Sequence, residues 1–266
     1  MATRIFYNQQ WNDSTNFQMD SLNSGFYFGE SFFETIKAEG NTIPFWQLHK
    51  ERIQETISYL SIHLSSHWQH ELIFEVITNE LNRLSFKESK IRITFFRQSL
   101  SETEFTFLVE ISELMANPNS SLSLTIYYDN KKSVGKLSNF KTGNRWLYKV
   151  AADYAASTNF TDAIILNTNG YVAEATQSNL FILKNGLLLT PPLTDGMING
   201  VCRKFIVQNF SVIEKSIGIN ELMNADEIFL TNAVRWIQSV NKLEEKMLST
   251  EQTNNFAENF KKHLTA

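Results

Sequence analysis

The 266-residue sequence predicts a protein of mixed α and β structure, in which an α+β domain is followed by an α/β domain. Helical patterns of apolar residues alternate with short runs rich in β-branched and aromatic residues. A turn-forming cluster at residues 115–121 separates two such series. With 42% hydrophobic residues, the chain can fill two moderate cores. We therefore predict a small domain at 1–116, a linker at 117–121 and a large domain at 122–266.

The small domain contains two amphipathic patterns and three strand-like runs. Apolar residues recur at helical spacing in 45–62 and again in 71–84, which predicts two helices that each pack one face on a sheet. The runs 31–38, 91–98 and 105–111 are rich in β-branched and aromatic residues and predict strands.

The large domain is predicted to alternate strands, helices and hairpins. Asn169-Gly170 and Asn185-Gly186 each predict a hairpin turn, because both residue types tolerate positive φ. Ser249 and Gln252 have the spacing of a capping box at the start of a final helix. The other predicted elements are a strand at 122–128, helices at 144–157 and 200–209, and a strand at 226–231.

Composition argues against several classes of partner. The formal net charge is only −4, from 24 basic and 28 acidic residues, so neither nucleic acid nor an anionic membrane surface is an expected partner. A single cysteine, Cys202, cannot form an intramolecular disulfide. The first residues lead into polar sequence instead of an apolar signal core, and no apolar run reaches membrane-spanning length. We expect a cytoplasmic protein with a small ligand.

Lys141 and Glu174 are the most informative pair of residues in the chain. Lys141 stands just before Gly143 and Asn144, which suggests a turn at a helix entrance, and Glu174 follows a hairpin. A lysine amine can form a Schiff base with an aldehyde, and a carboxylate can pair with a pyridinium nitrogen. Taken singly, each would be read as an exposed surface charge. Together they match the two contacts that pyridoxal phosphate most requires.

Four blocks of sequence carry a resemblance to a known family. The chain resembles the fold type IV, or class IV aminotransferase, enzymes that depend on pyridoxal 5'-phosphate and share the D-amino acid aminotransferase-like fold. This family includes branched-chain aminotransferases and 4-amino-4-deoxychorismate lyases. The resemblance implies two domains with the cofactor between them, and a homodimer. The matching blocks are residues 29–36, residues 48–53, residues 140–145, and residues 171–174 with 179–181, 190–192 and 199–203.

The resemblance also implies roles for individual residues. Lys141 would bind the cofactor covalently and act as general acid and base, and Glu174 would bind the pyridine nitrogen. Arg52 would grip the phosphate, although taken alone it reads as a helix-surface arginine paired with Glu51 or Glu55. The other implied phosphate contacts come from a helix N-terminus at Gly200, Val201 and Cys202 and from a loop at Thr231, Asn232 and Ala233.

Three further features have competing interpretations. Cys202 is interpreted as a small apolar filler in preference to a nucleophile. His63, His67 and His70 could bind a metal on a helix, but a solvated helix end is the preferred interpretation, and we predict no metal site. The aromatic residues at 26–28 and 32–33 are predicted to pack the small domain, while Phe28 is also a candidate for facing substrate.

Within the family, the residues around Lys141 and Gly200 look most like those of the lyases. The lyase reaction releases pyruvate from 4-amino-4-deoxychorismate and leaves 4-aminobenzoate, a folate precursor. The segment after Arg97 lacks the glycine-rich turn and second arginine usual for binding a substrate carboxylate, so Arg97 or Arg145 would take that task. Trp146 stands where branched-chain aminotransferases place a tyrosine.

Two alternatives remain open. One is an aminotransferase that passes the amino group of a branched-chain or other amino acid to 2-oxoglutarate. The other is a catalytically silent binding protein on the same fold. In the two enzyme readings, the partner is a small-molecule amine or amino acid.

Overall fold

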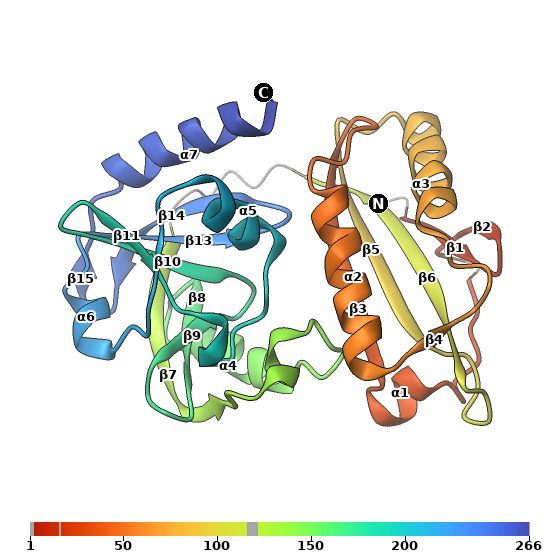
Figure 1. Cartoon of the computed structure of the whole chain (residues 1–266), viewed down its shortest axis with the longest axis horizontal. Coiled ribbons are helices and arrows are strands. Elements are labelled where there is room, and N and C mark those ends of the chain that lie inside the picture. Colours follow the sequence, from red (N-terminus) through yellow and green to blue (C-terminus); the bar gives the residue numbers. More distant parts are fainter. Residues whose placement is uncertain (1–2, 16, 116–121, 266) are drawn as a thin grey trace. The chain divides into compact units, whose positions relative to one another are not determined.

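The computed structural model describes residues 3–15, 17–115 and 122–265, and the chain divides into two compact units (Figure 1). Unit 1 comprises Met1–Ala116 together with Lys141–Asn144, and unit 2 comprises Asn117–Phe140 and Arg145–Ala266. The predicted linker at 117–121 lies outside the described residues. Within the described ranges, no helix combines the length and apolar character needed to cross a membrane.

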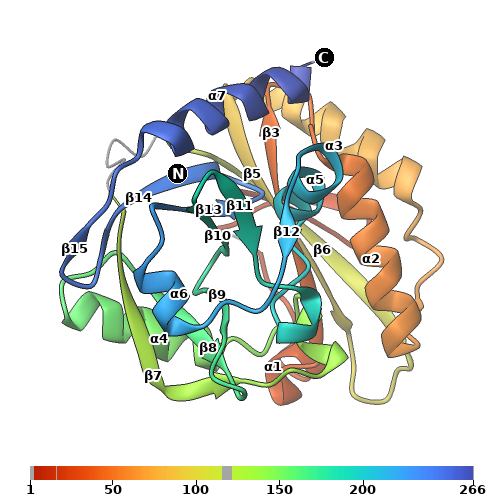
Figure 2. The ribbon, with the colours of Figure 1, turned by 60° about the vertical axis from the view of Figure 1, so that its left-hand side comes forward.

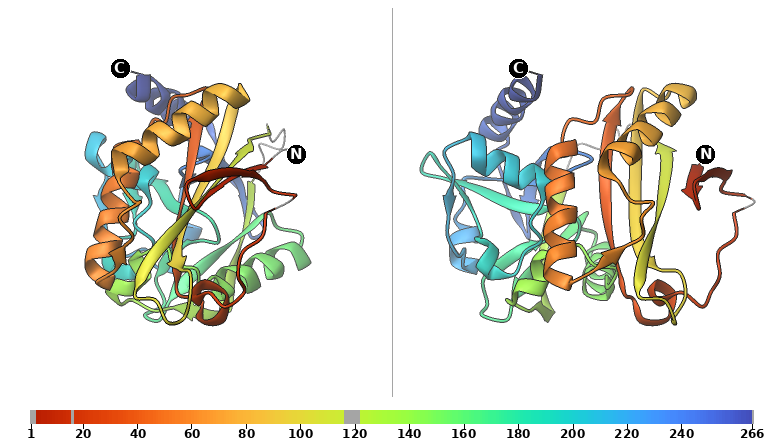
Figure 3. Two further views of the ribbon diagram at one scale, coloured as in Figure 1. Left: turned by 90° about the vertical axis from the view of Figure 1, so that its right-hand side faces the viewer. Right: turned by 45° about the vertical axis from the view of Figure 1, so that its right-hand side comes forward.

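Unit 1 is built on a six-stranded sheet in the order β2-β1-β6-β5-β3, with β4 paired to β6. All of its strand pairs are antiparallel except β4 with β6. Figure 3 shows the helices α2 and α3 of this unit beside its strands. The elements are β1 (Thr3–Tyr7), β2 (Gln10–Asp13), α1 (Ser24–Phe28), β3 (Ser31–Glu39), α2 (Trp46–Leu60), β4 (His63–Leu64), α3 (His70–Leu84), β5 (Glu88–Arg97) and β6 (Glu104–Glu113).

The periodicity of the sequence explains the core of unit 1. On α3, Ile73, Ile77 and Leu81 recur at helical spacing and are buried. They join Ile53 of α2 and alternating residues of β5, such as Ile93, in one hydrophobic cluster. The predicted helices at 45–62 and 71–84 and all three predicted strands are therefore confirmed.

The aromatic residues near the start of β3 divide into two groups. Phe32 and Phe33 are buried on β3, as predicted. Phe26 and Phe28 on α1 are 76% and 63% exposed, so the prediction that they pack the small domain is wrong. The reason is the shortness of α1, which has a single turn and buries only Ser24.

Unit 2 contains a nine-stranded sheet in the order β12-β11-β10-β13-β14-β7-β8-β9, with β15 paired to β14 (Figure 2). Strand β9 also packs beside β10, so the sheet curves around its core. The strands are β7 (Leu122–Lys132), β8 (Asp162–Asn167), β9 (Val172–Ala175), β10 (Asn179–Lys184), β11 (Leu187–Thr190), β12 (Ile213–Glu214), β13 (Glu227–Asn232), β14 (Trp236–Leu243) and β15 (Lys246–Met247). The helices are α4 (Trp146–Ser157), α5 (Val201–Asn209), α6 (Ile219–Met223) and α7 (Glu251–Thr265), with short 3-10 turns at Lys136–Asn139 and Leu193–Asp195.

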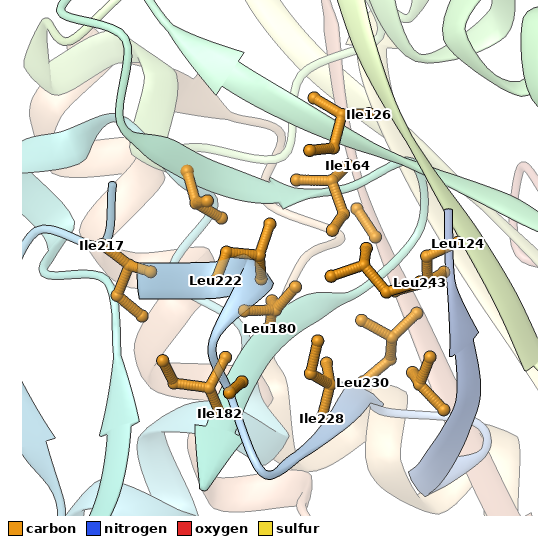
Figure 4. Packing of buried hydrophobic residues seen from close by; sticks show 14 of the residues in the cluster. Leu124, Ile126, Ile164, Leu180, Ile182, Ile217, Leu222, Ile228, Leu230 and Leu243 are labelled. Carbon is orange, nitrogen blue, oxygen red and sulfur yellow. The ribbon is translucent and has the colours of Figure 1, made fainter. Parts of the chain in front are cut away.

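The core of unit 2 is made of aliphatic side chains from seven of these strands (Figure 4). Leu124, Ile164, Leu180 and Ile228 belong to four of these strands and are fully buried. The apolar runs of β8 and β10 are continuous, and most of the residues in both strands are buried, as in strands covered on both faces.

The two predicted hairpin turns differ in the structure. Asn185 and Gly186 both have positive φ, as a two-residue type I′ turn requires, and this prediction is confirmed. The other hairpin joins β8 and β9 by a longer loop, in which the Asn167 side chain accepts hydrogen bonds from the amides of Asn169 and Tyr171. The turn is at the predicted place, but a side chain organises it.

The final helix begins near the predicted position, but the predicted capping box is wrong. The amides of Gln252 and Thr253 donate to the carboxylate of Glu227, at 3.0 and 2.8 Å, and the Ser249 hydroxyl donates to the same carboxylate. Burial opposes ionisation of Glu227, but these hydrogen bonds outweigh it and lower its pKa. A charged residue of β13, distant in sequence, therefore caps α7.

We predict that Glu227→Gln destabilises unit 2 by about 1–2 kcal/mol at neutral pH, because charge-assisted capping is lost. Since the folded-state pKa of Glu227 is lowered, its contribution is present above the unfolded-state pKa and is lost as pH falls through the lowered value. Urea unfolding at several pH values measures this contribution. Glu258→Gln, at an exposed position of α7, is the matched control and should change stability by less than about 0.5 kcal/mol. Equal effects of the two variants would contradict the capping role.

Candidate active site

The segment that carries Lys141 is fixed to the edge of β3 in unit 1. The Phe33 amide donates to the Lys141 carbonyl at 3.0 Å, and the Gly143 amide donates to the Ser31 carbonyl at 2.7 Å. A β-bridge joins Phe32 and Thr142 between these bonds. Lys141 is therefore held by backbone pairing with a strand that lies more than one hundred residues earlier in the chain.

Gly143 is needed for this close approach. A Cβ atom at this position would lie 2.1 Å from Ser31 Oγ and 3.4 Å from the Gly29 carbonyl oxygen. Any larger residue would require the Ser31 side chain to move. The sequence predicts a turn at Gly143. In the structure, close packing against Ser31 is a further reason for glycine at this position.

The amine of Lys141 lies over an aromatic ring of the same strand. Its Nζ atom is 4.4 Å from the centroid of the Phe33 ring, a cation–π distance. Lys141 is half-buried, so its amine is partly removed from water.

Arg52 is buried in unit 1 and is held by Glu34. Its Nε and Nη2 atoms donate to the two oxygens of Glu34, at 2.8 and 2.5 Å, in a bidentate pair. His49 Nδ1 lies 2.6 Å from Glu34 Oε2. Arg52 is only 6% exposed, so the reading of a solvated helix-surface arginine is wrong. This bidentate hold fixes the plane of the guanidinium.

The charges in this cluster determine its protonation. Burial alone would raise the pKa of Glu34, but the Arg52 charge, with the His49 and Arg52 hydrogen bonds, lowers it to about 2. Burial lowers the pKa of His49, and the nearby cations Arg52 and Lys141 lower it further. Glu34 is therefore a carboxylate at neutral pH, and His49 donates its Nδ1 proton to it.

Glu174 is buried on β9 of unit 2, with an exposed fraction of 3%. One carboxylate oxygen, Oε1, forms an ion pair with Lys132 and accepts the Tyr148 hydroxyl at 2.7 Å. The other, Oε2, accepts the Ile198 amide at 3.0 Å and lies 3.4 Å from Asn179 Nδ2. The reading of an exposed strand-end carboxylate is wrong.

Tyr148 and Arg145 extend this cluster. The guanidinium carbon of Arg145 lies 3.7 Å from the centroid of the Tyr148 ring, and its Nη2 donates to the Thr176 carbonyl at 2.9 Å. Burial and the Glu174 charge raise the pKa of Tyr148, so its hydroxyl keeps its proton and remains a donor. Arg145 thus lies over the Tyr148 ring, whose hydroxyl contacts the buried carboxylate.

Asn179 connects Glu174 to the start of α5. Its Nδ2 atom donates to the Ile198 carbonyl at 2.8 Å. A Cβ atom at Gly200 would lie 1.9 Å from Asn179 Oδ1, so only glycine permits this contact. Helix α5 begins directly after Gly200, at Val201, where its first amides are without partners inside the helix.

Thr231 lies on the same face of the sheet as Asn179, because the two residues are directly paired in the ladder of β10 and β13. Its hydroxyl is buried and has no hydrogen-bond partner among the described residues. Unpaired helix amides together with a buried hydroxyl on one face fit a phosphate group. Asn232 uses its side-chain oxygen for the amides of Val234 and Arg235, at 3.0 and 2.8 Å.

The amino-transferase class IV family matches residues 31–243. The chain belongs to this family. It is a pyridoxal-phosphate-dependent enzyme of fold type IV, with the mixed α and β fold that the sequence predicted.

The relatives of this class IV enzyme include proteins named as aminotransferases and proteins named as lyases. A putative branched-chain-amino-acid aminotransferase of Methanocaldococcus jannaschii is 22% identical, covering 97% of this chain and 94% of the relative. The aminodeoxychorismate lyase of Bacillus subtilis is 24% identical, covering 91% and 87%. The solved branched-chain aminotransferase of Escherichia coli has a TM-score of 0.88 at 18% identity, covering 98% of this chain and 94% of that chain. The last likeness shows the fold alone.

Two residues of this class IV enzyme that were predicted to contact substrate, Arg97 and Phe28, have no special environment in the structure. Arg97, at the end of β5, forms an ion pair with Glu30 and donates to the Glu102 carbonyl at 3.2 Å. Phe28 projects from α1 into solvent. Cys202 is buried and burial raises the pKa of its thiol, which disfavours a nucleophile.

The three histidines considered as a metal site, His63, His67 and His70, do not lie on one helix. His63 lies in β4 and His67 in the turn that follows, and only His70 lies at a helix end, the start of α3. Among the described residues, no group of three or more His, Cys, Asp or Glu side chains is placed to hold a metal ion.

Each unit brings together part of the predicted site. Unit 1 places Lys141 and Arg52 close to His49 and Glu34. In unit 2, Asn179 connects Glu174, Gly200 and Thr231. Sequence reasoning missed Lys132, Tyr148 and the role of Asn179. Asn179 was inside a matching block, and Tyr148 shares the buried face of α4 with Ala151 and Ala155.

We predict that Glu34→Gln destabilises unit 1 by about 3 kcal/mol, because it leaves the buried Arg52 without its counter-charge. The folded-state pKa of Glu34 is about 2, so its contribution is present above the unfolded-state pKa and is lost as pH falls toward 2. The difference between wild type and variant should therefore shrink below about pH 4. Urea unfolding at pH 7, 5 and 3 tests this. The matched control, Glu39→Gln, alters a carboxylate on the same strand that is 45% exposed; it should cost less than about 0.5 kcal/mol.

Proposed function

We propose that this enzyme is an aminodeoxychorismate lyase, which converts 4-amino-4-deoxychorismate to 4-aminobenzoate and pyruvate. The observation that carries the proposal is the sequence around Lys141, where Asn144-Arg145 follows the lyase pattern. Trp146, at the position where branched-chain aminotransferases place a tyrosine, is 76% exposed. Arg145 lies against Tyr148 near Glu174, where a cation suits a substrate that carries carboxylates.

In this proposal, bound pyridoxal phosphate supplies an electron sink for the pair left when a C–H bond of the substrate breaks. Glu174, ion-paired to Lys132, would accept a hydrogen bond from the protonated ring nitrogen. In unit 2, Thr231 Oγ1 and the amides at Val201 and Cys202 would donate to the phosphate, and Arg52 of unit 1 is the further cation proposed for it. Asn232 and Ala233 shape the loop after β13, and the buried hydroxyl of Thr231 makes it the donor from that loop.

Lys141 moves the protons. Its half-buried amine removes the proton from the carbon that bears the substrate amine, and then delivers a proton to the departing enolpyruvate. The C–O bond to enolpyruvate breaks as the ring becomes aromatic. The Phe33 ring beneath Nζ limits where the amine can point.

An aminotransferase is the second candidate, since relatives with high coverage carry the name branched-chain-amino-acid aminotransferase. The same residues would then shift a proton between two carbons instead of assisting an elimination. Arg97 supports neither candidate strongly, because Glu30 already occupies its guanidinium.

Product analysis separates the candidates. Purified protein with pyridoxal phosphate is incubated with 4-amino-4-deoxychorismate, and separately with amino acids and 2-oxoglutarate. Release of 4-aminobenzoate and pyruvate supports the lyase. Glutamate formation without 4-aminobenzoate would replace it by the aminotransferase.

We predict that Lys141→Ala lowers the rate of either reaction by at least about 10²–10⁴-fold, because the proton-transfer group is lost. The same change should abolish the visible absorption that depends on covalent attachment of the cofactor. Lys149→Ala, which removes an exposed lysine of α4 paired with Asp153, is the control and should leave both unchanged. A silent binding protein would show no product with any substrate pair, and absorption that survives Lys141→Ala would contradict the role of this lysine.

A further inference from the structure

We propose that Lys132 is a positioning residue for Glu174, which keeps this carboxylate ionised and sets how strongly it holds the proton of the cofactor's ring nitrogen. The inference rests on the proposed binding of the cofactor by Glu174, and it assigns a role to a lysine that the reaction chemistry above does not use. Lys132 closes β7, and its Nζ forms an ion pair with Glu174 Oε1.

The strand is irregular where it brings Lys132 inside. The pairing of β7 with β8 shifts register between Tyr127 and Lys132, and the four residues between them are exposed. Lys132 is then buried, with a side chain only 8% exposed, and its carbonyl accepts the Thr168 amide at 2.9 Å. Bulges of this kind re-aim side chains near functional sites. The irregularity turns this lysine toward Glu174 while its neighbour Lys131 stays in solvent.

Neutral groups already hold Glu174, so the lysine adds charge to the cluster. The Tyr148 hydroxyl and the Ile198 amide donate to the two carboxylate oxygens, with Asn179 nearby. A buried ammonium is costly, and burial lowers the pKa of Lys132, as does the like charge of Arg145. Only Glu174 opposes these effects. Because these neutral donors already orient the carboxylate, we expect the main effect of Lys132 on Glu174 to be electrostatic.

The charged and titratable groups around Glu174 come from several elements. They are Lys132 from β7, Tyr148 from α4 and Arg145 just before α4, and Arg145 points to the Tyr148 ring and the Thr176 carbonyl. Lys132 is therefore the cation in direct contact with the carboxylate. A cation within about 4–6 Å lowers the pKa of a carboxyl group by about 1–3. Removing it should raise the proton affinity of Glu174 and of any cationic group that Glu174 holds.

The first test is spectroscopic. The visible absorption of the pyridoxal-phosphate-loaded protein is titrated with pH in wild type, Lys132→Met, Lys132→Arg and the exposed control Lys131→Met. We expect Lys132→Met to raise the midpoint by about one pH unit, since loss of a cation favours protonated forms. Lys132→Arg should restore the wild-type midpoint, and Lys131→Met should not move it. An unchanged midpoint in Lys132→Met would overturn the proposal, even if the variant were less stable.

The second test needs no cofactor. In the cofactor-free Lys132→Met protein, Glu174 is buried without a counter-ion, so we expect its folded-state pKa to be raised. Stability should then be highest below the unfolded-state pKa and should fall as pH rises through the raised value. Adding Glu174→Gln should remove this pH step, and absence of the step in Lys132→Met would overturn the inference. If wild type shows no cofactor absorption, the proposed function fails, while this step still reports on the Lys132 and Glu174 pair.

Discussion

The buried carboxylate of Glu174 is the constraint on which the arrangement of unit 2 depends. A carboxylate removed from water must be compensated by donors or a counter-charge. Here the donors come from four parts of the chain: Lys132 of β7, Tyr148 of α4, Asn179 of β10 and the Ile198 amide just before α5. These elements can satisfy the carboxylate only in one relative position. The same interactions that satisfy the Glu174 carboxylate therefore fix the frame that carries it.

Unit 1 uses the same physical device with the roles exchanged. There a buried carboxylate, Glu34, orients a cation, Arg52, through two parallel hydrogen bonds, with His49 as the neutral donor. In unit 2 the carboxylate is the group that would contact ligand, and the cation Lys132 supports it. In both clusters a charge that is proposed to bind a ligand is held by an opposite charge on a neighbouring element. Each cluster is thus rigid before any ligand arrives.

The spacing of apolar residues predicted the secondary structure well, because in α2, α3 and β5 each element buries one face and its apolar residues recur with the period of that face. The family pattern pointed to Lys141, Arg52 and Glu174, but gave no indication of what holds them. Lys132 is 42 positions from Glu174, and its burial follows from a register shift with no local signature. Glu227 caps α7 from 25 positions away, where a nearby serine offered a simpler reading. Long-range polar contacts of this kind depend on the tertiary fold.

Asn179 connects the parts of unit 2 that are proposed to bind the cofactor ring and the cofactor phosphate. Its amide nitrogen contacts both the Ile198 carbonyl and Glu174, and its oxygen lies against Gly200, at the start of α5. Through the ladder of β10 and β13 it also fixes the position of Thr231. The separation between Glu174 and the proposed phosphate donors is therefore set by one side chain and two backbone segments. A cofactor with a ring nitrogen at one end and a phosphate at the other requires such a fixed separation, because error at either contact would be transmitted to the reacting carbon.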